Sequence, residues 1–574
     1  MKFYRLIQSF LWVLCSLLII SNAWAETLRV DITGVQGDAL KNAQERLRLL
    51  QDSYGKSLTA ANIQTIYRAA PENLQKALEP FGYFSAKIEP HLNQQGQSYV
   101  ATFAVNPGQP VIVTAVNTRI TGEGQDDPAL NKLLQHFPVK TQQIFSADNY
   151  NKAKQALFDT ANNQGYLKAK LTQKEIYLDT KAHTAIITLH LETGPRYYFG
   201  EIHFQQDAFS EKFLRRFLPF HEGDPYASNQ VLTFQQNLNN SHFFQMASVN
   251  PDIDNAKNFA VPMDVDLTAN KSQQYNIGIG YGTFTGARLT TGVNFRHLTK
   301  TGHHMNVQIK LSSILSGLAL QYVIPGSNPL TDEYTIGANA QRFIPKNGYS
   351  LSKTLSVGYV KTIHHWKHAL NLNYLRENSY VNGPNNVSHN SRIFYPSYTL
   401  SHTTSDDLVN PTRGHRIELS MKGASDQFIS NTKFVQTEIK AKYLFAPTEA
   451  SRIILRGDFG VTVVHDLTTL PISLQFYSGG LDSVRVFPYS YEGPGRYLKV
   501  ASVEYQHRII NNWHGALFYD CGTASNNFST PLDKSVGFGV IYQSIIGPVK
   551  VYAGRTLTGT KRHYGIDFSI GPEL

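Results

Sequence analysis

The sequence has little cysteine and, beyond its first residues, no long hydrophobic run. Only two cysteines occur in 574 residues, so the fold cannot depend on a network of disulfide bonds. After the first 25 residues, no apolar run reaches the roughly 18 residues that a membrane-spanning helix needs. The chain therefore either stays in water or crosses a membrane as a closed barrel, whose strands are apolar on one face only.

Motifs for nucleic acid, metal and covalent catalysis are also missing. The net charge is +10, but the basic residues are scattered, without a lysine-rich tail or an aromatic-basic motif. Neither a Gly-x-Ser-x-Gly elbow nor a His-Glu-x-x-His zinc motif occurs. The histidines at 364, 365 and 368 lack an adjacent carboxylate or cysteine, which favours an interfacial surface. We expect no nucleic-acid ligand, no metal or other cofactor, and no enzymatic activity.

The first 25 residues have the composition of a secretory signal peptide. A positively charged start precedes an apolar run at 10–20, and Ala23 and Ala25 suit a cleavage site before Glu26. The run is about half as long as a spanning helix, which favours cleavage over anchoring. We therefore expect residues 1–25 to be removed and the rest to be exported. Anionic lipid head groups are then the most suitable partner for the positive charge.

The first half of the remaining chain carries an internal repeat. The segments 81–87, 164–170 and 241–247 resemble one another at a spacing of about 80 residues. Each follows a helix-like segment and precedes a strand-like run, and the first two units close with a glycine-proline turn. A small α+β unit with the order β-α-α-β-β, used three times in series, fits this pattern. The expected units are 26–109, 110–197 and 198–271.

From residue 272 onward, apolar and polar residues alternate, as in Met305–Ser312. Because a strand turns successive side chains to opposite faces, each segment has one apolar and one polar face. In Ile453–Val463 the polar face contains Arg456 and Asp458, which suit a hydrated lumen better than the dry core of a β-sandwich. We expect 272–574 to form a sixteen-stranded antiparallel transmembrane β-barrel. The sixteen segments start near 274, 287, 303, 316, 333, 349, 366, 391, 414, 434, 451, 497, 513, 533, 547 and 563.

One connection in this half, 465–496, is far longer than the others. It contains Gly479 and Gly480, followed by Val484-Arg485-Val486-Phe487. Long connections are usually functional or disordered, and the aromatic and branched residues here favour a packed segment. The segment can fold back into the lumen.

Two carboxylates on the strands after this segment are candidate partners for Arg485. An arginine held away from bulk water needs paired acceptors, and Glu504 and Asp520 can supply them in fork geometry. The parity of its strand turns Asp520 inward together with Phe518 and Gly522. The pattern alone also allows three unrelated lumen charges. The hypothesis is that the pairing pins the inserted segment.

These segments resemble the motifs of the outer-membrane POTRA-barrel assembly superfamily (BamA/TamA-like). Val484-Arg485-Val486-Phe487 is similar to the Val-Arg-Gly-Phe/Tyr motif in the loop after the eleventh strand, with Val486 in place of glycine. If that glycine serves a positive φ angle, the tip must bend differently here. Val503-Glu504-Tyr505 resembles the twelfth strand, and Phe518-Tyr519-Asp520-Cys521-Gly522 resembles the Phe-x-Asp-x-Gly of the thirteenth. The last six residues, 569–574, and the three repeats are most similar to TamA-like members.

The resemblance implies N-terminal POTRA repeats in the periplasm and a barrel in the bacterial outer membrane. It also implies a function in which the protein helps insert or secrete autotransporter-type clients, together with a TamB-like, inner-membrane-anchored periplasmic partner. Unfolded outer-membrane polypeptides and outer-membrane lipids are then the other expected partners. Alternatives are a two-partner-secretion type polypeptide transporter and a role in phospholipid transport with the same partner. A passive porin explains the barrel but not the repeats.

The junction between the first and last strands is the expected place of opening. The first strand covers about 274–281, and the last covers about 563–573 with Phe568, Gly571 and Pro572. Proline cannot donate a ladder hydrogen bond, so the final pairing should be short. An opened junction offers free backbone groups to an incoming strand, which is β-augmentation.

Overall fold

The computed structural model describes residues 27–55, 58–96, 98–282, 286–346, 348–381, 387–407, 410–427, 429–544, 547–559 and 563–570. The expected signal peptide and the seam residues Gly571 and Pro572 lie outside these ranges. The chain divides into two compact units, one ending at Ile202 apart from two later segments, 220–232 and 251–263. The other unit contains 203–219, 233–250 and the barrel.

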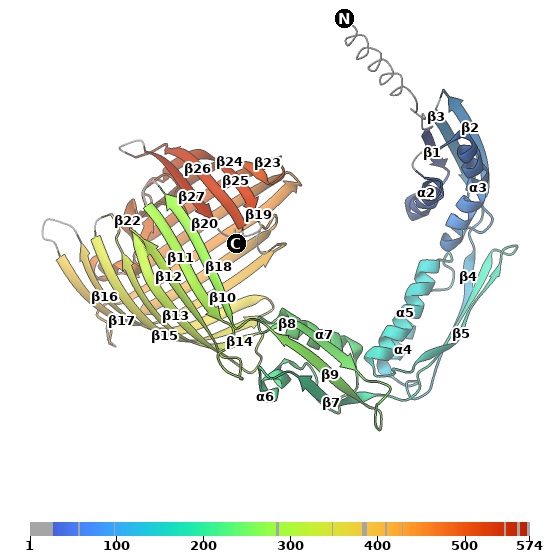
Figure 1. The fold of residues 1–574 in the computed structure, drawn as a ribbon, viewed down its shortest axis with the longest axis horizontal. Helices are drawn as coiled ribbons and strands as arrows, with labels where there is room; N and C mark the ends of the chain where they lie inside the picture. The colour runs from blue at the N-terminus through green and yellow to red at the C-terminus, as the bar shows by residue number, and fades with distance from the viewer. Residues whose placement is uncertain are drawn as a thin grey trace, which may run out of the picture. The chain divides into compact units, whose positions relative to one another are not determined.

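The N-terminal part consists of three β-α-α-β-β repeats, as the sequence predicts (Figure 1). The first contains β1 (Thr27–Thr33), α2 (Gly37–Asp52), α3 (Ala60–Leu78), β2 (Lys87–Gln95) and β3 (Ser98–Asn106). The second contains β4 (Ile112–Thr121), α4 (Pro128–Gln135), α5 (Ala147–Asn163), β5 (Lys170–Asp179) and β6 (Thr184–Glu192). The third contains β7 (Tyr198–Gln205), α6 (Glu211–Leu214), α7 (Ser228–Asn240), β8 (Phe244–Pro251) and β9 (Ala260–Ala269). Two short 3-10 turns, η1 (Glu79–Phe81) and η2 (Arg215–Phe217), extend α3 and α6.

Each repeat forms a three-stranded sheet whose last strand is central. The sheet orders are β1-β3-β2, β4-β6-β5 and β7-β9-β8. The first strand runs parallel to the central one in the first two repeats, where the two helices provide the crossover. No helix among the described residues is both long enough and apolar enough to cross a membrane.

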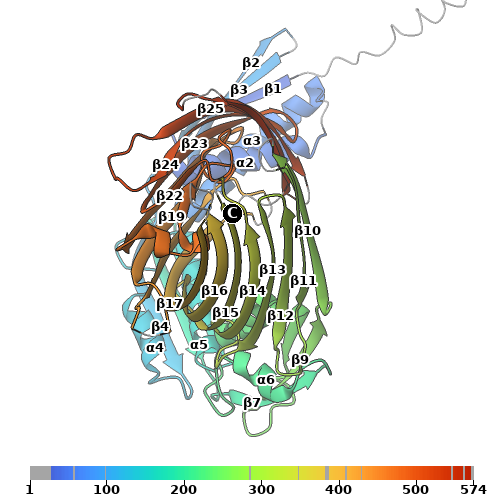
Figure 2. The ribbon, with the colours of Figure 1, turned by 90° about the vertical axis from the view of Figure 1, so that its left-hand side faces the viewer.

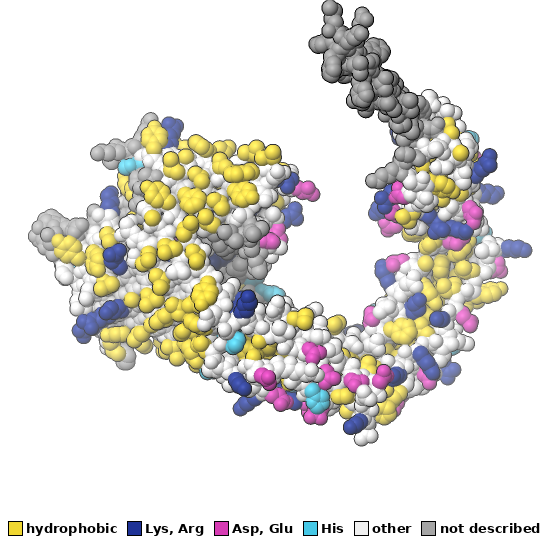
Figure 3. Space-filling view, viewed as in Figure 1, with side chains coloured by type: hydrophobic (Ala, Val, Ile, Leu, Met, Phe, Trp, Pro, Cys, Tyr) yellow, Lys and Arg dark blue, Asp and Glu magenta, His cyan; other side chains and the backbone are white. Residues whose placement is uncertain are grey.

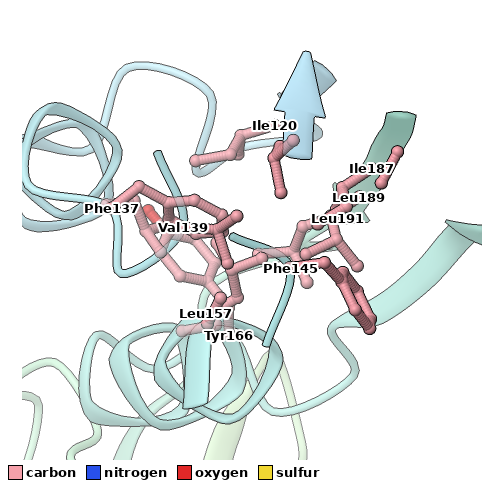
Figure 4. Close-up of a cluster of buried hydrophobic side chains, with 14 of the residues drawn as sticks. Ile120, Phe137, Val139, Phe145, Leu157, Tyr166, Ile187, Leu189 and Leu191 are labelled. Carbon is pink, nitrogen blue, oxygen red and sulfur yellow. The ribbon is translucent and has the colours of Figure 1, made fainter. Parts of the chain in front are cut away.

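Local sequence explains where these helices begin and what they bury. The hydroxyl of Ser146 accepts a hydrogen bond from the Asn149 amide and caps α5, and Asp127 caps α4 in the same way. The apolar face of α5 packs on the alternating face of β6, so that Leu157 and Leu189 are almost fully buried (Figure 4). Each small repeat therefore has its own apolar core.

The C-terminal half is a closed sixteen-stranded antiparallel barrel (Figures 1 and 2). Its first eight strands are β10 (Gln273–Gly282), β11 (Gly286–Phe295), β12 (His304–Ser312), β13 (Leu315–Pro325), β14 (Asp332–Phe343), β15 (Gly348–Ile363), β16 (Trp366–Val381) and β17 (Val387–Ser405). The other eight are β18 (Gly414–Ala424), β19 (Phe434–Thr448), β20 (Ser451–Val464), β23 (Tyr497–Ile510), β24 (Trp513–Ser525), β25 (Asp533–Ser544), β26 (Gly547–Thr556) and β27 (Tyr564–Ile570).

Fifteen of the sixteen expected strand starts lie within one residue of the observed ones, and the exception is β17. It starts at Val387 rather than near 391, because Ser388, His389 and Asn390 lack the apolar alternation yet pair with the end of β16. These longer strands, β15 to β17, form part of one curved wall in Figure 2.

The two faces of the barrel wall differ as the alternation predicts. Hydrophobic side chains form broad patches on the barrel face seen in Figure 3. Ile336, Leu355 and Leu370 are among the exposed hydrophobic residues of the wall. Residues that alternate with the outward-facing ones, such as Asn373 and Glu377 of β16, turn inward and are buried. An apolar exterior with a polar interior is what a strand-built membrane protein requires.

The third repeat contacts the barrel rim through an aromatic cluster. Phe213 of α6 packs edge-on against Phe243 and lies against Gly302, where a Cβ atom would collide with the Phe213 ring. The Ser210 amide donates to the Lys300 carbonyl oxygen at 2.8 Å, and Arg216 donates to the Pro325 carbonyl oxygen at 2.8 Å. The rim that bears this contact is the end at which β10 begins.

Candidate functional site

The segment 465–496 is a packed structure, not an open loop. It contains two 3-10 turns, η3 (Leu467–Thr469) and η4 (Ile472–Leu474), and a small hairpin of β21 (Phe476–Ser478) with β22 (Glu492–Gly495). Its apolar side chains are buried against inward-facing wall residues, for example Phe487 with Leu498 of β23. The segment therefore occupies the lumen, as expected from its composition.

The structure brings Arg485 together with both predicted carboxylates. The guanidinium donates to Asp520 of β24 through Nε and Nη2, each at 2.8 Å, and through Nη1 to Glu504 of β23. The backbone amide of Arg485 also donates to Asp520 at 3.0 Å. Arg485 is 4 % exposed, Glu504 6 % and Asp520 0 %, so the three charges are shielded from water and depend on one another.

Three polar side chains that the sequence reading missed complete the hydrogen bonding. Ser502 accepts from Arg485 Nη2 at 3.1 Å and donates to Asp520 at 2.6 Å. Gln506 and the Tyr552 hydroxyl donate to Glu504 at 2.6 and 2.7 Å. Tyr552 belongs to β26, so the cluster ties three barrel strands together. An inward tyrosine among apolar neighbours is the one signal that could have revealed it.

Two aromatic rings enclose the Arg485 guanidinium. Its central carbon lies 3.9 Å from the centre of the Phe518 ring and 5.0 Å from that of Tyr552. A desolvated cation–π contact of this kind contributes about 2 kcal/mol. Phe518, predicted from its strand motif, therefore shapes the site directly.

The residues beside Arg485 fill the space between segment and wall. A Cβ atom on Gly522 would lie 2.9 Å from a Val484 methyl carbon and 2.7 Å from the Lys499 carbonyl oxygen, so glycine is needed for this approach. Phe487 is 2 % exposed in the same cluster. Gly479 and Gly480 form the turn before it, both at positive φ, and the Gly480 amide donates to the carbonyl oxygens of Val484 and Phe487.

Val486 adopts the conformation that the family's glycine would allow. Its φ angle is +73°. The tip therefore does not need the different bend that we expected if the family's glycine serves a positive φ angle. A β-branched residue in this region is strained by about 1–3 kcal/mol. The side chain is also buried against Phe518, Ile541 and Tyr552, which offsets the strain.

A second set of contacts holds the other end of the segment. The Glu377 carboxylate of β16, itself 0 % exposed, accepts from the Ile472 amide at 2.6 Å and from the Ser473 amide at 3.1 Å. Gln436 of β19 donates to the Leu474 carbonyl oxygen at 2.8 Å. A cluster of buried apolar side chains surrounds this end: Leu375, Ile393, Tyr395, Phe434, Val464, Leu467, Leu470 and Leu474.

The junction between the first and last strands has few pairs. Among the described residues, β10 and β27 pair at three positions: Gly280 with Ser569, Tyr281 with Phe568 and Gly282 with Asp567. By contrast, β15 and β16 pair at sixteen. The predicted seam residue Phe568 therefore lies in the closing ladder itself.

A set of β-α-α-β-β repeats ahead of a sixteen-stranded barrel, with an arginine-bearing segment in its lumen, defines a POTRA-domain barrel protein. A family model for the Omp85 superfamily domain matches residues 265–573, and the chain belongs to that superfamily. The model for the first POTRA domain of TamA matches 29–107. A further POTRA model, described as a surface antigen variable number repeat, matches 117–194 and 197–270.

Solved structures share this fold at low sequence identity. BamA from Haemophilus ducreyi lacking POTRA domains 1–3 is 18 % identical with a TM-score of 0.64, covering 79 % of this chain and 99 % of that one. CdiB from Acinetobacter baumannii is 13 % identical with a TM-score of 0.50, covering 94 % and 99 %. CdiB from Escherichia coli has the same identity and TM-score, covering 94 % and 100 %.

Proposed function

We propose that the protein is an outer-membrane assembly factor whose N-terminal repeats, 26–109, 110–197 and 198–271, lie in the periplasm. It helps insert or secrete autotransporter-type β-barrel clients through the seam between β10 and β27. The observation that carries this proposal is that the described residues of β27 pair with β10 at three positions, whereas other neighbouring strands pair at up to sixteen.

A short ladder makes the seam the cheapest place to open the wall. Within the described residues, β10 pairs with β11 from Gln273 to Gly282 and with β27 only from Gly280 to Gly282. Backbone groups along this edge of β10 can pair with a client strand, as in β-augmentation. The free energy comes from burial of the client's apolar face in lipid, so neither a nucleotide nor a covalent step is needed.

Because the lumen is filled by a packed segment, the seam is the more suitable route for a client. The segment 465–496 is held at Arg485 and again at Glu377, on different parts of the wall. A client passing through the lumen would have to displace buried apolar clusters and two sets of charge-assisted hydrogen bonds. The Arg485 cluster also joins β23, β24 and β26, the last of which pairs with the seam strand β27.

The partners follow from the same proposal. Unfolded outer-membrane polypeptides are the clients, outer-membrane lipids surround the barrel, and a TamB-like periplasmic protein works with the repeats. The TamA-type first domain supports that partner. Co-purification of the full chain from its native membrane tests it, because a large periplasmic subunit should be recovered with it.

A disulfide across the seam tests the route. We choose Tyr281→Cys with Phe568→Cys, which are register partners, in a Cys521→Ser background. The matched control is Ile279→Cys with Leu289→Cys, which locks the same strand to β11. Oxidation of the seam pair should stop client assembly, reductant should restore it, and the control pair should have no effect.

A second candidate function is a two-partner-secretion type transporter. The likeness to the two CdiB structures, which covers 94 % of this chain, favours considering it. Such a transporter uses the lumen, so the oxidised seam variant would remain fully active. Phospholipid transport with the same partner is a further alternative, which lipid-transfer measurements on the seam-locked protein address.

A further inference from the structure

Four basic side chains gather on the lipid-facing side of adjacent barrel strands. They are Arg342 of β14, Lys353 of β15, Arg376 of β16 and Arg392 of β17. All four are exposed, whereas their chain neighbours, such as Glu377, are buried toward the lumen. Figure 3 shows Lys and Arg side chains among the hydrophobic ones over β16 and β17.

The strand register places three of these cations side by side. Lys353 pairs with Arg376, and Arg376 pairs with Arg392. Adjacent strands are about 4.8 Å apart, so the row spans about 10 Å. Arg342 is diagonal to Lys353, because its own partner in β15 is Leu351. Like charges directly opposite one another on a sheet repel, so the sequence maintains an unfavourable arrangement here.

No acidic side chain compensates the row. Among the described residues, no salt bridge involves any of the four cations. By comparison, the outward-facing Lys499 on the far wall donates to the Phe528 and Thr530 carbonyl oxygens. A multivalent anion from outside the chain is therefore the natural counter-charge.

A hydrophobic hollow adjoins the row. It has a volume of about 330 Å³ and is bordered by Lys353 and Arg376. Below the cations its walls are apolar, with the small Ala338 and Ala340 on β14 between larger neighbours: Leu318, Leu320, Leu355 and Tyr374. Basic groups beside an apolar hollow match the two parts of a membrane lipid, its anionic head group and its acyl chains.

The row lies near the barrel end opposite the rim that α6 contacts at Lys300 and Pro325. Strands β15 and β17 begin at that end, and Lys353 and Arg392 each follow within six residues of the strand start. With the repeats on the periplasmic side, this end faces outward, and the cations lie at the head-group level of the outer leaflet.

We propose that Lys353, Arg376 and Arg392, with Arg342, bind the phosphate groups of a multiply phosphorylated, acylated lipid of the outer leaflet. Arginine forms paired hydrogen bonds with phosphate oxygens, and clustered basic residues at a membrane surface attract anionic head groups. One acyl chain lies in the hollow over Ala338 and Ala340. The lipid thereby binds to the wall formed by β14 to β17, across the barrel from the seam.

Lipid titration of the full chain in phosphatidylcholine nanodiscs tests this site. The probe is bis-phosphorylated lipid A, compared with mono-phosphorylated lipid A and phosphatidylglycerol. Wild type should bind the bis-phosphorylated lipid at least tenfold more tightly than the other two. The variant Lys353→Gln/Arg376→Gln/Arg392→Gln should lose at least tenfold in affinity, and the single variant Arg376→Gln should lose part of it.

Two further variants separate charge from the hollow. Lys534→Gln/Arg555→Gln removes outward cations elsewhere on the barrel and should bind like wild type. Ala338→Trp fills the hollow and should weaken lipid binding several-fold without weakening the binding of inorganic pyrophosphate. Unchanged affinity in the triple variant, equal binding of all three lipids, or pyrophosphate binding as tight as lipid A would each overturn the assignment.

Discussion

At the scale of single residues, the Arg485 cluster depends on mutual compensation of charge. Arg485 faces two carboxylates, and its remaining donor reaches Ser502, so each nitrogen of the guanidinium has an acceptor. Glu504 is further neutralised by donors from Gln506 and Tyr552. Such a cluster tolerates the loss of any one member poorly, because the partner charges then remain buried and unpaired.

Arg485→Ala should leave export intact but lower the barrel's stability by about 3–5 kcal/mol, because Asp520 and Glu504 lose their cation. Client assembly should fall with it. Stability is measured as the urea midpoint of the folded form on a semi-native gel. The matched control is Arg416→Ala, since Arg416 is half exposed and forms an ion pair with Glu418 of its own strand. Its loss should cost about 0–1 kcal/mol, and wild-type stability and assembly in Arg485→Ala would disprove pinning.

Sequence reasoning reached part of this cluster and missed the rest for a physical reason. Arg485, Glu504 and Asp520 are charged residues at inward positions, and charges away from bulk water require partners. Tyr552, Ser502 and Gln506 are polar residues that also suit a hydrated lumen without any specific contact. Only the closure of the barrel, which brings β26 beside β23's glutamate, distinguishes them. The positive φ angle of Val486 was likewise not apparent, since valine rarely adopts it.

At the scale of elements, the inserted segment 465–496 is attached to the barrel wall at two places. One end carries Arg485, and the other is the turn η4, whose first amides donate to Glu377. A carboxylate at the start of a helical turn satisfies donors that have no partner within the turn. The sequence did not reveal Glu377, because it lies about ninety residues before the segment that it holds.

Glu377→Gln should destabilise the attachment of the segment at η4 by about 1.5–3 kcal/mol, because a neutral amide replaces a charged acceptor of two hydrogen bonds. Proteolysis of 465–474 in the folded barrel should accelerate accordingly, while cleavage near Arg485 should not. Glu418→Gln is the control, because Glu418 also faces the lumen and forms its ion pair with Arg416 of its own strand. Equal protection in both variants would show that Glu377 does not hold this end.

His242 makes the contact between the third repeat and the barrel rim sensitive to acid. Burial, reinforced by the nearby His304 and Arg296, lowers the pKa of His242 from 6.5 to about 4. The neutral ring is therefore favoured in the folded state, whereas the unfolded state takes up a proton at higher pH. Stability from this residue is fully present above pH 6.5 and is lost as the pH falls toward 4.

Hydrogen exchange of β8 amides between pH 7 and pH 4.5, corrected for the intrinsic rate, measures this effect. The wild type should lose protection across that range. His242→Gln should show a flatter profile, because it cannot take up the proton. Parallel profiles in the two proteins would mean that another group controls the contact.

At the scale of the whole molecule, the barrel wall is uneven in strength. Strand β16 pairs at sixteen positions with each neighbour, whereas the described residues of β27 (Tyr564–Ile570) pair with β10 at three. Alternate amides of Gln273–Ile279 point toward the seam and should exchange with solvent at least tenfold faster than those of β16. Hydrogen-exchange mass spectrometry of the folded protein in detergent tests this, and uniform protection around the wall would exclude a weak closure.

Strand positions were the most predictable feature of the molecule, because lipid outside and water inside impose the period of two on every strand. The start of β17 was placed four residues late, since Ser388, His389 and Asn390 lack the apolar alternation although they pair with β16. Closure strength was predictable only in outline. It depends on register between segments at opposite ends of the barrel, which local alternation does not encode.

The neighbours β10 and β27 are the first and last strands of the barrel in sequence, so the sheet cannot become a cylinder until nearly its entire length has been synthesised. Until then the sheet has two edge strands with unpaired backbone groups. A circular permutant that joins these ends and starts between β15 and β16 would exchange the weakest junction for the most extensively paired one. It should close firmly and lose the opening through which we propose that clients pass.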